Sequence, residues 1–387
     1  MECRYTDYKI HSPIAVNMRK LIFLLLFGGI LLLACKKTEK TDPNQVIIEQ
    51  LKSAADSVIG NTKVPGLVAL VVDHKRGIDW LYAVGQGDLS NGQPMNAENT
   101  FRIGSCTKTF TLTVLLQLAG EGKISLTDKL SKYFPEYPKA DSITITMLCN
   151  MTSRIHDFFH IEPSLFITMR QNPTKVWDPN ELIGLGFASG FDSIPGKGFG
   201  YSNTNTFILG KIIEKLTNNT LETEINNRII RPLQLTNSGF LTSGIELPGT
   251  HGRGYYFIDY IPGEDFTEFF DVSVYWAAGA AYSTPRELQR FAEALVGGGL
   301  LPDSLQYKRL NNNFYVLPDV AYGLGIMKRG TFYGHSGEMP GFMTNMYHSN
   351  EKDCTIIIYY NSLLIGSEND PGVLFIKFLN ILYGDNY

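Results

Sequence analysis

The stretch TFRIGSCTKTFTLTVLLQLAG, residues 100–120, decides how this chain folds around its chemistry. Ser105 and Lys108 stand three residues apart, and the apolar run 109–119 contains neither Pro nor Gly before it stops at Gly120. Such a run predicts a buried helix with Ser105 at its N-terminus. Residues three apart share a helix face, so we expect Lys108 one turn below Ser105. The helix N-terminus also favours negative charge that develops at the serine.

A serine-x-x-lysine pattern by itself carries little information, because both residue types are common. The chain contains a second copy at residues 349–352, between the apolar runs 341–348 and 355–360, where it predicts a hairpin turn. Ser105 could equally be an N-cap residue, and Lys108 a surface lysine. A lysine at the start of an apolar helix needs solvent or a polar partner, and that requirement favours a chemical role.

Two further motifs follow in order, Tyr201-Ser202-Asn203 and His335-Ser336-Gly337. With the serine and the lysine they supply a nucleophile, its base, a proton shuttle and one side of an oxyanion hole, from separate segments of the chain. These are the parts needed for acyl transfer through a covalent serine ester. The G-x-S-x-G pattern of α/β-hydrolases is absent from the sequence.

With these motifs in this order, the chain resembles the serine β-lactamase and penicillin-binding protein superfamily, in its class C-like branch. That branch includes DD-carboxypeptidases, D-amino-acid peptidases and β-lactamase-fold esterases. The resemblance covers nearly everything after residue 47, with family-like stretches at residues 99–108, 128–135, 201–216, 231–233, 276–284, 322–325 and 340–342. It implies an α/β (α+β) fold of the β-lactamase/transpeptidase type, in which helices flank an antiparallel sheet and a helical lobe is inserted.

The resemblance also assigns roles to residues. It implies five catalytic residues: Ser105, Lys108, Tyr201, Asn203 and His335. In such a site the serine attacks the substrate carbonyl, the lysine and tyrosine transfer its proton, and the asparagine holds the substrate amide. The backbone N–H groups of Ser105 and Glu338 would form the oxyanion hole. Ser336 and Gly337 are expected to bind substrate. A substrate carboxylate would need a cation, and the candidates are Lys328 and Arg329, just upstream on an expected strand. The alternative is that they form a solvated pair near a turn at Gly330.

Two positions depart from the family pattern. Many relatives carry lysine where this chain has His335, and the histidine form is more typical of the peptidases and esterases. An unperturbed histidine titrates near neutrality, so we expect His335 to make the acidity of Tyr201 pH-dependent between about pH 5.5 and 7.5. The alternative is that His335 donates one hydrogen bond. Relatives read His-Thr-Ser-Gly where residues 151–154 read Met-Thr-Ser-Arg, and a positive φ would strain Arg154 by about 1 kcal/mol.

The first 46 residues are interpreted as a targeting and anchoring segment rather than as part of the folded domain. Residues 18–35 resemble a lipoprotein signal peptide, with a basic start, an apolar run and Cys35 as the lipidated cysteine. Residues 1–17 are unlike an export signal and are interpreted as a non-native extension, and residues 36–46 as a flexible tether. We therefore expect a lipid-anchored protein of the cell envelope, on the periplasmic face or on the outer membrane surface.

Residues 47–387 are interpreted as one serine β-lactamase-like catalytic domain with two lobes. The α/β lobe comprises residues 47–100 and 285–387, and the helical lobe residues 101–284. Strands are predicted at residues 66–72 and 78–84, with three more within 321–361. Helices are predicted at residues 46–59, at 285–295 behind a capping box at 284–287, and at 371–383.

Composition excludes several classes of function. The formal net charge of −4 argues against nucleic acid as a partner. Walker and dinucleotide glycine patterns are absent, and the pair His156 and His160 has no obvious third ligand nearby, so we expect neither a cofactor nor a metal. The odd set Cys106, Cys149 and Cys354 argues against a disulfide framework, and we interpret Cys106 as a buried filler.

The sequence therefore predicts a monomeric serine acyl hydrolase of the envelope that acts on a peptide, β-lactam or ester. A D-alanyl-D-alanine carboxypeptidase-like activity is the first expectation, and a β-lactamase or a β-lactamase-fold esterase the alternative. A protein that binds muropeptides or β-lactams with little catalysis is the alternative from another class.

Overall fold

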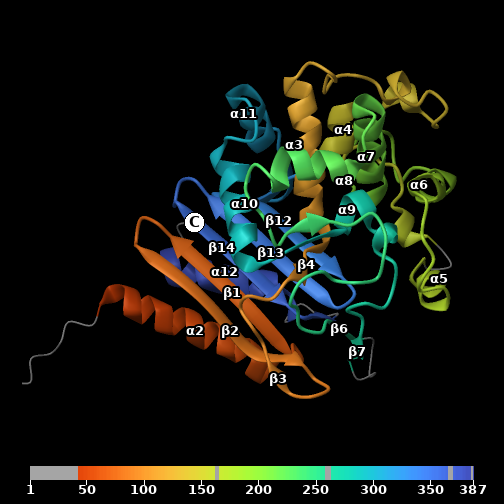
Figure 1. Cartoon of the computed structure of the whole chain (residues 1–387). Coiled ribbons are helices and arrows are strands. Elements are labelled where there is room, and N and C mark those ends of the chain that lie inside the picture. The colour runs from red at the N-terminus through yellow and green to blue at the C-terminus, as the bar shows by residue number, and fades with distance from the viewer. Residues whose placement is uncertain (1–41, 162–164, 258–262, 365–368, 385–386) are drawn as a thin grey trace, which may run out of the picture. The chain divides into compact units, whose positions relative to one another are not determined.

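One antiparallel sheet joins the two ends of the chain (Figure 1). The computed structural model describes residues 42–161, 165–257, 263–364, 369–384 and 387. Within them the sheet has nine strands in the order β3-β2-β1-β14-β13-β12-β11-β10-β9. Three strands come from the first part of the chain: β1 (Gly66–Asp73), β2 (Ile78–Asp88) and β3 (Gln93–Pro94). Six come from its last part: β9 (Phe314–Leu317), β10 (Val320–Tyr322), β11 (Met327–Arg329), β12 (Phe332–Met339), β13 (Phe342–Ser349) and β14 (Cys354–Tyr360). The pairing of β1 with β14 confirms the predicted sheet built from both ends.

Both faces of this sheet are covered, so β1, β13 and β14 are buried along their whole length. Side chains alternate between the faces of a strand, and β1 feeds two cores. Val68 and Leu70 join one core with α10 (Pro285–Gly297), whereas Leu67 and Ala69 join the other. That second core also contains side chains of α2 (Pro43–Asn61) and of the C-terminal helix α12 (Pro371–Tyr383). Residues 46–387 belong to one compact unit.

The middle of the chain is helical and packs around α3 (Thr107–Gly120), the buried helix that the opening stretch predicts. The other α-helices are α4 (Ile145–Cys149), α5 (Leu165–Gln171), α6 (Pro179–Ala188), α7 (Asn203–Thr217), α8 (Leu221–Ile225), α9 (Trp276–Gly279) and α11 (Asp303–Asn311). Short helical turns are η1 (Gly104–Cys106), η2 (Leu130–Lys132), η3 (Ala140–Ser142), η4 (Phe158–His160), η5 (Asn226–Ile230) and η6 (Val272–Val274). Helices α7 and α9 contact α3 directly, so they hold the segment that carries Ser105 and Lys108.

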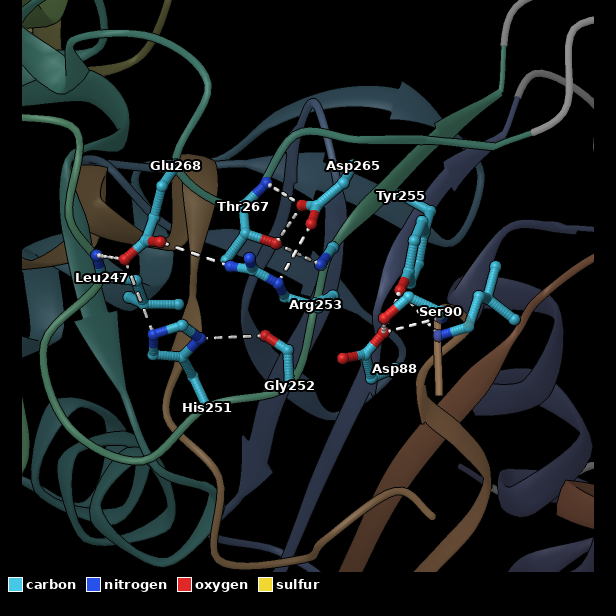
Figure 2. A network of polar contacts seen from close by, with 12 residues as sticks. Asp88, Ser90, Leu247, His251, Gly252, Arg253, Tyr255, Asp265, Thr267 and Glu268 are labelled. Atoms are coloured by element: carbon cyan, nitrogen blue, oxygen red, sulfur yellow. Dashed lines mark hydrogen bonds and ion pairs between the residues drawn. The ribbon is translucent and has the colours of Figure 1, made fainter. Parts of the chain in front are cut away.

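Two small sheets connect the helical part to the large sheet. One consists of β4 (Phe101–Arg102), β8 (Ala281–Ser283) and β5 (Gly239–Phe240), and the other of β15 (Ser362–Leu364), β6 (Tyr255–Phe257) and β7 (Glu264–Asp265). Figure 2 shows the polar network around β6 and β7. Arg253 pairs with Asp265 at 3.0 Å and with Glu268 at 3.3 Å, and Tyr255 donates to Asp88 of β2 at 3.2 Å. The network ties this small sheet to the β2–β3 hairpin.

Several local predictions are corrected. Thr284 is the N-cap residue of α10, but its side chain makes no cap hydrogen bond. Glu287 instead accepts hydrogen bonds from the Asn237 N–H at 3.0 Å and the Ser238 hydroxyl at 2.6 Å, so tertiary partners replace the capping box. The region predicted to hold three strands also contains the short strands β10 and β11, which are too brief to show a clear alternation.

The start of the chain is only partly described. Helix α2 begins at Pro43, so residues 43–46 are helical rather than part of a flexible tether. The predicted extension, signal peptide and lipidated Cys35 lie outside the described residues. Among the helices of the described ranges, none is long and apolar enough to span a membrane. The strands at 66–72 and 78–84 and the helix at 371–383 are confirmed.

Candidate active site

The serine-x-x-lysine segment forms the floor of the site. Ser105 lies in η1, and α3 begins two residues later, so Lys108 stands in its first turn. Lys108 Nζ is 2.9 Å from Ser105 Oγ, which confirms the predicted placement of the lysine below the serine. Lys108 is 0% exposed and is therefore not a surface lysine. The N-cap residue of α3 is Cys106, so the Ser105 hydroxyl remains available for chemistry.

Lys108 is held by three oxygen atoms in a buried position. Besides Ser105, Nζ contacts Asn203 Oδ1 at 2.7 Å and the Ala278 carbonyl at 3.1 Å. Burial lowers the pKa of Lys108 to about 7, and the nearby negative charge of Asp157 acts in the opposite direction. A lysine with this pKa is partly neutral at neutral pH, so it can accept a proton from the serine.

The second motif places Tyr201 beside the serine and Asn203 beside the lysine. Lys108 Nζ lies 4.9 Å from the centre of the Tyr201 ring. Burial and the neighbouring Tyr322 raise the pKa of Tyr201 well above its ordinary value, while a hydrogen bond with Ser105 opposes that rise. The phenol is therefore protonated at rest and can pass a proton to a neighbouring group.

His335 behaves differently from the prediction made for it. It lies on β12 and is 1% exposed. Burial, followed by the charge of Lys108, lowers the pKa of His335 to about 3. The expected titration between pH 5.5 and 7.5 is therefore wrong, because the imidazole is neutral throughout that range. Its Nδ1 contacts the Ser336 carbonyl and its Nε2 lies 3.1 Å from the Tyr322 hydroxyl, so Nδ1 carries the hydrogen and Nε2 accepts.

Glycines allow η1 and β12 to approach each other closely. A Cβ atom on Gly337 would lie 2.0 Å from the Ile103 carbonyl oxygen and 3.1 Å from the Ser105 nitrogen. A Cβ atom on Gly104 would lie 2.8 Å from the Glu338 nitrogen. No side chain fits at either glycine, so the backbone around Ser105 and the backbone of Glu338 lie close together. An oxyanion hole built from the N–H groups of both residues requires this proximity.

A cavity of about 310 Å³ opens above these groups. Its lining contains five residues that the sequence singled out: Ser105, Tyr201, His335, Ser336 and Glu338. The rest of the lining is almost entirely apolar or aromatic: Phe199, Val316, Val320, Ala321, Tyr322 and Met327. Lys328 and Arg329 lie on β11 as predicted, but they are not among the lining residues. Lys328 Nζ stands instead over the rings of Tyr315 and Tyr333.

One residue of the site, Asp157, was not singled out from the sequence. Asp157 is 3% exposed, and its Oδ2 accepts a hydrogen bond from Asn203 Nδ2 at 2.8 Å, so it orients the amide that contacts Lys108. Its neighbour His156 pairs with Asp192 at 2.7 Å rather than with a second histidine. The described residues contain no group of three potential metal ligands. Cys106 is buried, with its Sγ 3.2 Å from the His335 carbonyl, which confirms the filler interpretation.

Comparison with known proteins identifies the family to which this chain belongs. A sequence profile of the beta-lactamase family matches residues 45–371. A D-stereospecific amidohydrolase from Streptomyces sp. is 27% identical, with a TM-score of 0.77 over 88% of this chain and 99% of that one. The D-amino acid amidase of Ochrobactrum anthropi SV3, solved with L-phenylalanine amide, is 26% identical, with a TM-score of 0.76 over the same 88% and 99%.

Curated relatives are matched over a smaller share of their own length. The D-aminopeptidase of Cereibacter sphaeroides is 24% identical over 81% of this chain and 60% of that protein. Across the curated relatives matched first, the chain spans from 38% to 66% of their length. The profile, in contrast, extends over most of this chain, and the solved relatives share its fold over nearly their full length. The chain thus has the β-lactamase fold, and it belongs to the beta-lactamase family.

Proposed function

We propose that this protein hydrolyses amides and short peptides that begin with an apolar D-amino acid, releasing that residue through an acyl-enzyme at Ser105. The observation that carries the proposal is the charge of the cavity. Among the described residues that line it, Glu338 alone has a charged side chain. A carboxylate there suits a substrate with a free α-ammonium group, whereas a substrate carboxylate would find no cation.

A second carboxylate strengthens this argument. Burial and the nearby charge of Asp370 raise the pKa of Glu338. Asp370 thus adds a second acidic residue near Glu338. A carboxypeptidase or a β-lactamase would need a cation for the substrate carboxylate. Lys328 and Arg329, the candidates for that cation, are not among the residues that line the cavity. An aminopeptidase or amidase activity thus fits this cavity better than the carboxypeptidase activity that we first expected.

The proposed chemistry uses the groups in the order in which they lie. Neutral Lys108 takes the proton as Ser105 Oγ bonds to the substrate carbonyl carbon, and the backbone N–H groups of Ser105 and Glu338 bind the resulting oxyanion. Tyr201 delivers a proton to the leaving nitrogen as the carbon–nitrogen bond breaks, and it regains one from protonated Lys108. Water then attacks the ester carbonyl carbon and gives a proton to Lys108. The bond from Ser105 Oγ to that carbon breaks, the acid is released, and Lys108 returns the proton to Ser105. Asn203 holds Lys108 in place, since its Oδ1 and Nδ2 already contact Lys108 and Asp157.

The apolar part of the lining supports an apolar substrate residue. Phe199, Val316 and Met327 surround a space in which an aliphatic or aromatic side chain would be buried from water. The preference for the D-configuration rests on the names of relatives, a D-stereospecific amidohydrolase and a D-aminopeptidase. An envelope location, with a lipid on Cys35, remains our proposal from the sequence of residues 18–35.

The test compares four substrates with the purified full-length protein. We expect release of p-nitroaniline from D-phenylalanine p-nitroanilide, much slower release from its L-enantiomer and from its N-acetyl derivative, and no activity in Ser105→Ala. Glu338→Gln should raise KM for the free amine about fivefold and leave the N-acetyl compound unaffected. Faster cleavage of a peptide ending in D-alanyl-D-alanine, or a lasting mass gain with penicillin, would reject the proposal in favour of a carboxypeptidase or binding protein.

A further inference from the structure

Arg154 adopts a backbone conformation that its side chain makes unfavourable. Its φ is +64°, in the left-handed region, and Met151 in the same loop has a φ of +60°. Glycine enters this region without cost, whereas an arginine persists there only where its surroundings stabilise it. The strain expected from the sequence is therefore present, and the surroundings of Arg154 show what holds it.

The loop of residues 151–154 is bonded to the segment that leads into the second motif. The Arg154 Nη1 group donates to the Phe199 carbonyl. Backbone hydrogen bonds join the Arg154 carbonyl to the Asp192 N–H at 2.9 Å, and the Met151 carbonyl to the Gly200 N–H at 2.8 Å. A Cβ atom on Gly200 would lie 2.5 Å from Arg154 Nη1, so a larger residue there would displace the guanidinium from its present position.

The residue that Arg154 holds is part of the cavity wall. Phe199 lines the cavity, and its ring packs against Phe314 of β9 at 6.1 Å and against Tyr322 of β10 at 5.7 Å between ring centres. Tyr322 in turn contacts His335. The Phe199 ring therefore packs against strands at the edge of the large sheet, while its carbonyl accepts the hydrogen bond from Arg154.

We propose that Arg154 is a positioning residue that fixes Phe199 and thereby sets how well the site accepts a large apolar substrate group. The inference rests on the proposed function in one respect, namely that the cavity receives that group. Arg154 is not among the lining residues, so it acts through Phe199. The hydrogen bond to the Phe199 carbonyl is the feature that matters, and the strained φ is its cost.

Three substitutions separate the hydrogen bond from the backbone strain. Arg154→Lys keeps a donor, Arg154→Met keeps the length without a donor, and Arg154→Gly removes both the donor and the strain. We expect the ratio of kcat/KM for D-phenylalanine p-nitroanilide over D-alanine p-nitroanilide to fall about tenfold in the Met and Gly variants, mainly through KM. Arg154→Lys should retain most of the wild-type ratio. Arg231→Met, which changes an exposed arginine bonded to Asn227, is the matched control.

A wild-type ratio in Arg154→Met would overturn the proposal, and so would a loss confined to Arg154→Gly, because the backbone conformation alone would then be responsible. Amide hydrogen exchange supplies a second readout that needs no substrate. Protection of the Gly200 N–H should fall about tenfold in Arg154→Met and Arg154→Gly but not in Arg231→Met. If the wild type cleaves neither anilide, the proposed function fails, while p-nitrophenyl acetate and p-nitrophenyl phenylacetate still measure the same size preference.

Discussion

Replacing Asp157 by asparagine should move the pH dependence of the enzyme in a defined direction. Asp157 Oδ2 accepts from Asn203 Nδ2 at 2.8 Å, and Asn203 Oδ1 accepts from Lys108 at 2.7 Å. One amide thus separates the carboxylate from the ammonium, which places the two charges within roughly 8 Å of each other. At an effective dielectric constant of about 20 this attraction is worth about 2 kcal/mol, or about 1.5 pH units in the pKa of Lys108.

The direction of this shift in the pH profile follows from the role of Lys108 as a base. Only the neutral amine accepts the serine proton, so kcat/KM should rise with pH through the Lys108 pKa of about 7. The carboxylate of Asp157 stabilises the charged form and so raises that pKa. Asp157→Asn removes the charge but keeps an oxygen that can accept from Asn203. The acid limb of the profile, where kcat/KM rises with pH, should then have its midpoint at about pH 5.5.

The assay is the pH profile of kcat/KM for p-nitrophenyl acetate, measured from about pH 4 to about pH 9. Asp79→Asn is the control, because it makes the same change in charge on a side chain that is 62% exposed and paired with Arg286. The reasoning is refuted if the limb of Asp157→Asn stays with that of the control or moves to higher pH. A wild-type profile without an acid limb near pH 7 would show that Lys108 is not the base.

Two further outcomes can be checked independently. His335→Gln should lower kcat but leave the acid limb at the pH where the wild type has it. The reason is that burial lowers the pKa of His335 to about 3, so the imidazole is neutral throughout that pH range. A shifted acid limb in the same pH profile would contradict this. Glu287→Ala should lower the free energy of unfolding by about 2 kcal/mol, because it removes the carboxylate that accepts from the Asn237 N–H and from the buried Ser238 hydroxyl. Urea denaturation measures this loss, and a value below about 0.5 kcal/mol would show that water replaces the carboxylate.

Local features of this fold could be predicted from the sequence because they depend on neighbours in the chain. The contact between Ser105 and Lys108 requires only one helical turn, and α3 supplies it. The helix at residues 371–383 and the strand at residues 66–72 follow from runs of apolar residues that both ends of the sheet must bury. The meeting of Tyr201 with these residues came from the resemblance of ordered motifs, since no local rule brings distant segments together.

What the sequence could not reveal depends on burial and on partners far along the chain. His335 has an ordinary titration range in sequence, but in the fold it is enclosed and faces the charge of Lys108, so its pKa falls. Glu287 stands where a capping box is expected, yet the N–H of Asn237 competes successfully for it. Asp157 has no recognisable motif, because its function is to orient an amide that is 46 residues away.

The neutral His335 and the lowered pKa of Lys108 have a common cause. Each group lies in a position closed to water, and a charge on one disfavours a charge on the other, since the charge of Lys108 is one of the reasons that the pKa of His335 falls. Two adjacent cations would drive Lys108 further from the charged form, whereas a neutral imidazole leaves Asp157 as the main opposing influence on its pKa. A neutral hydrogen-bonding group in the third motif therefore lets a buried lysine remain a base near neutral pH. The pH profile of His335→Lys would measure that coupling directly, with the acid limb moving below its wild-type position.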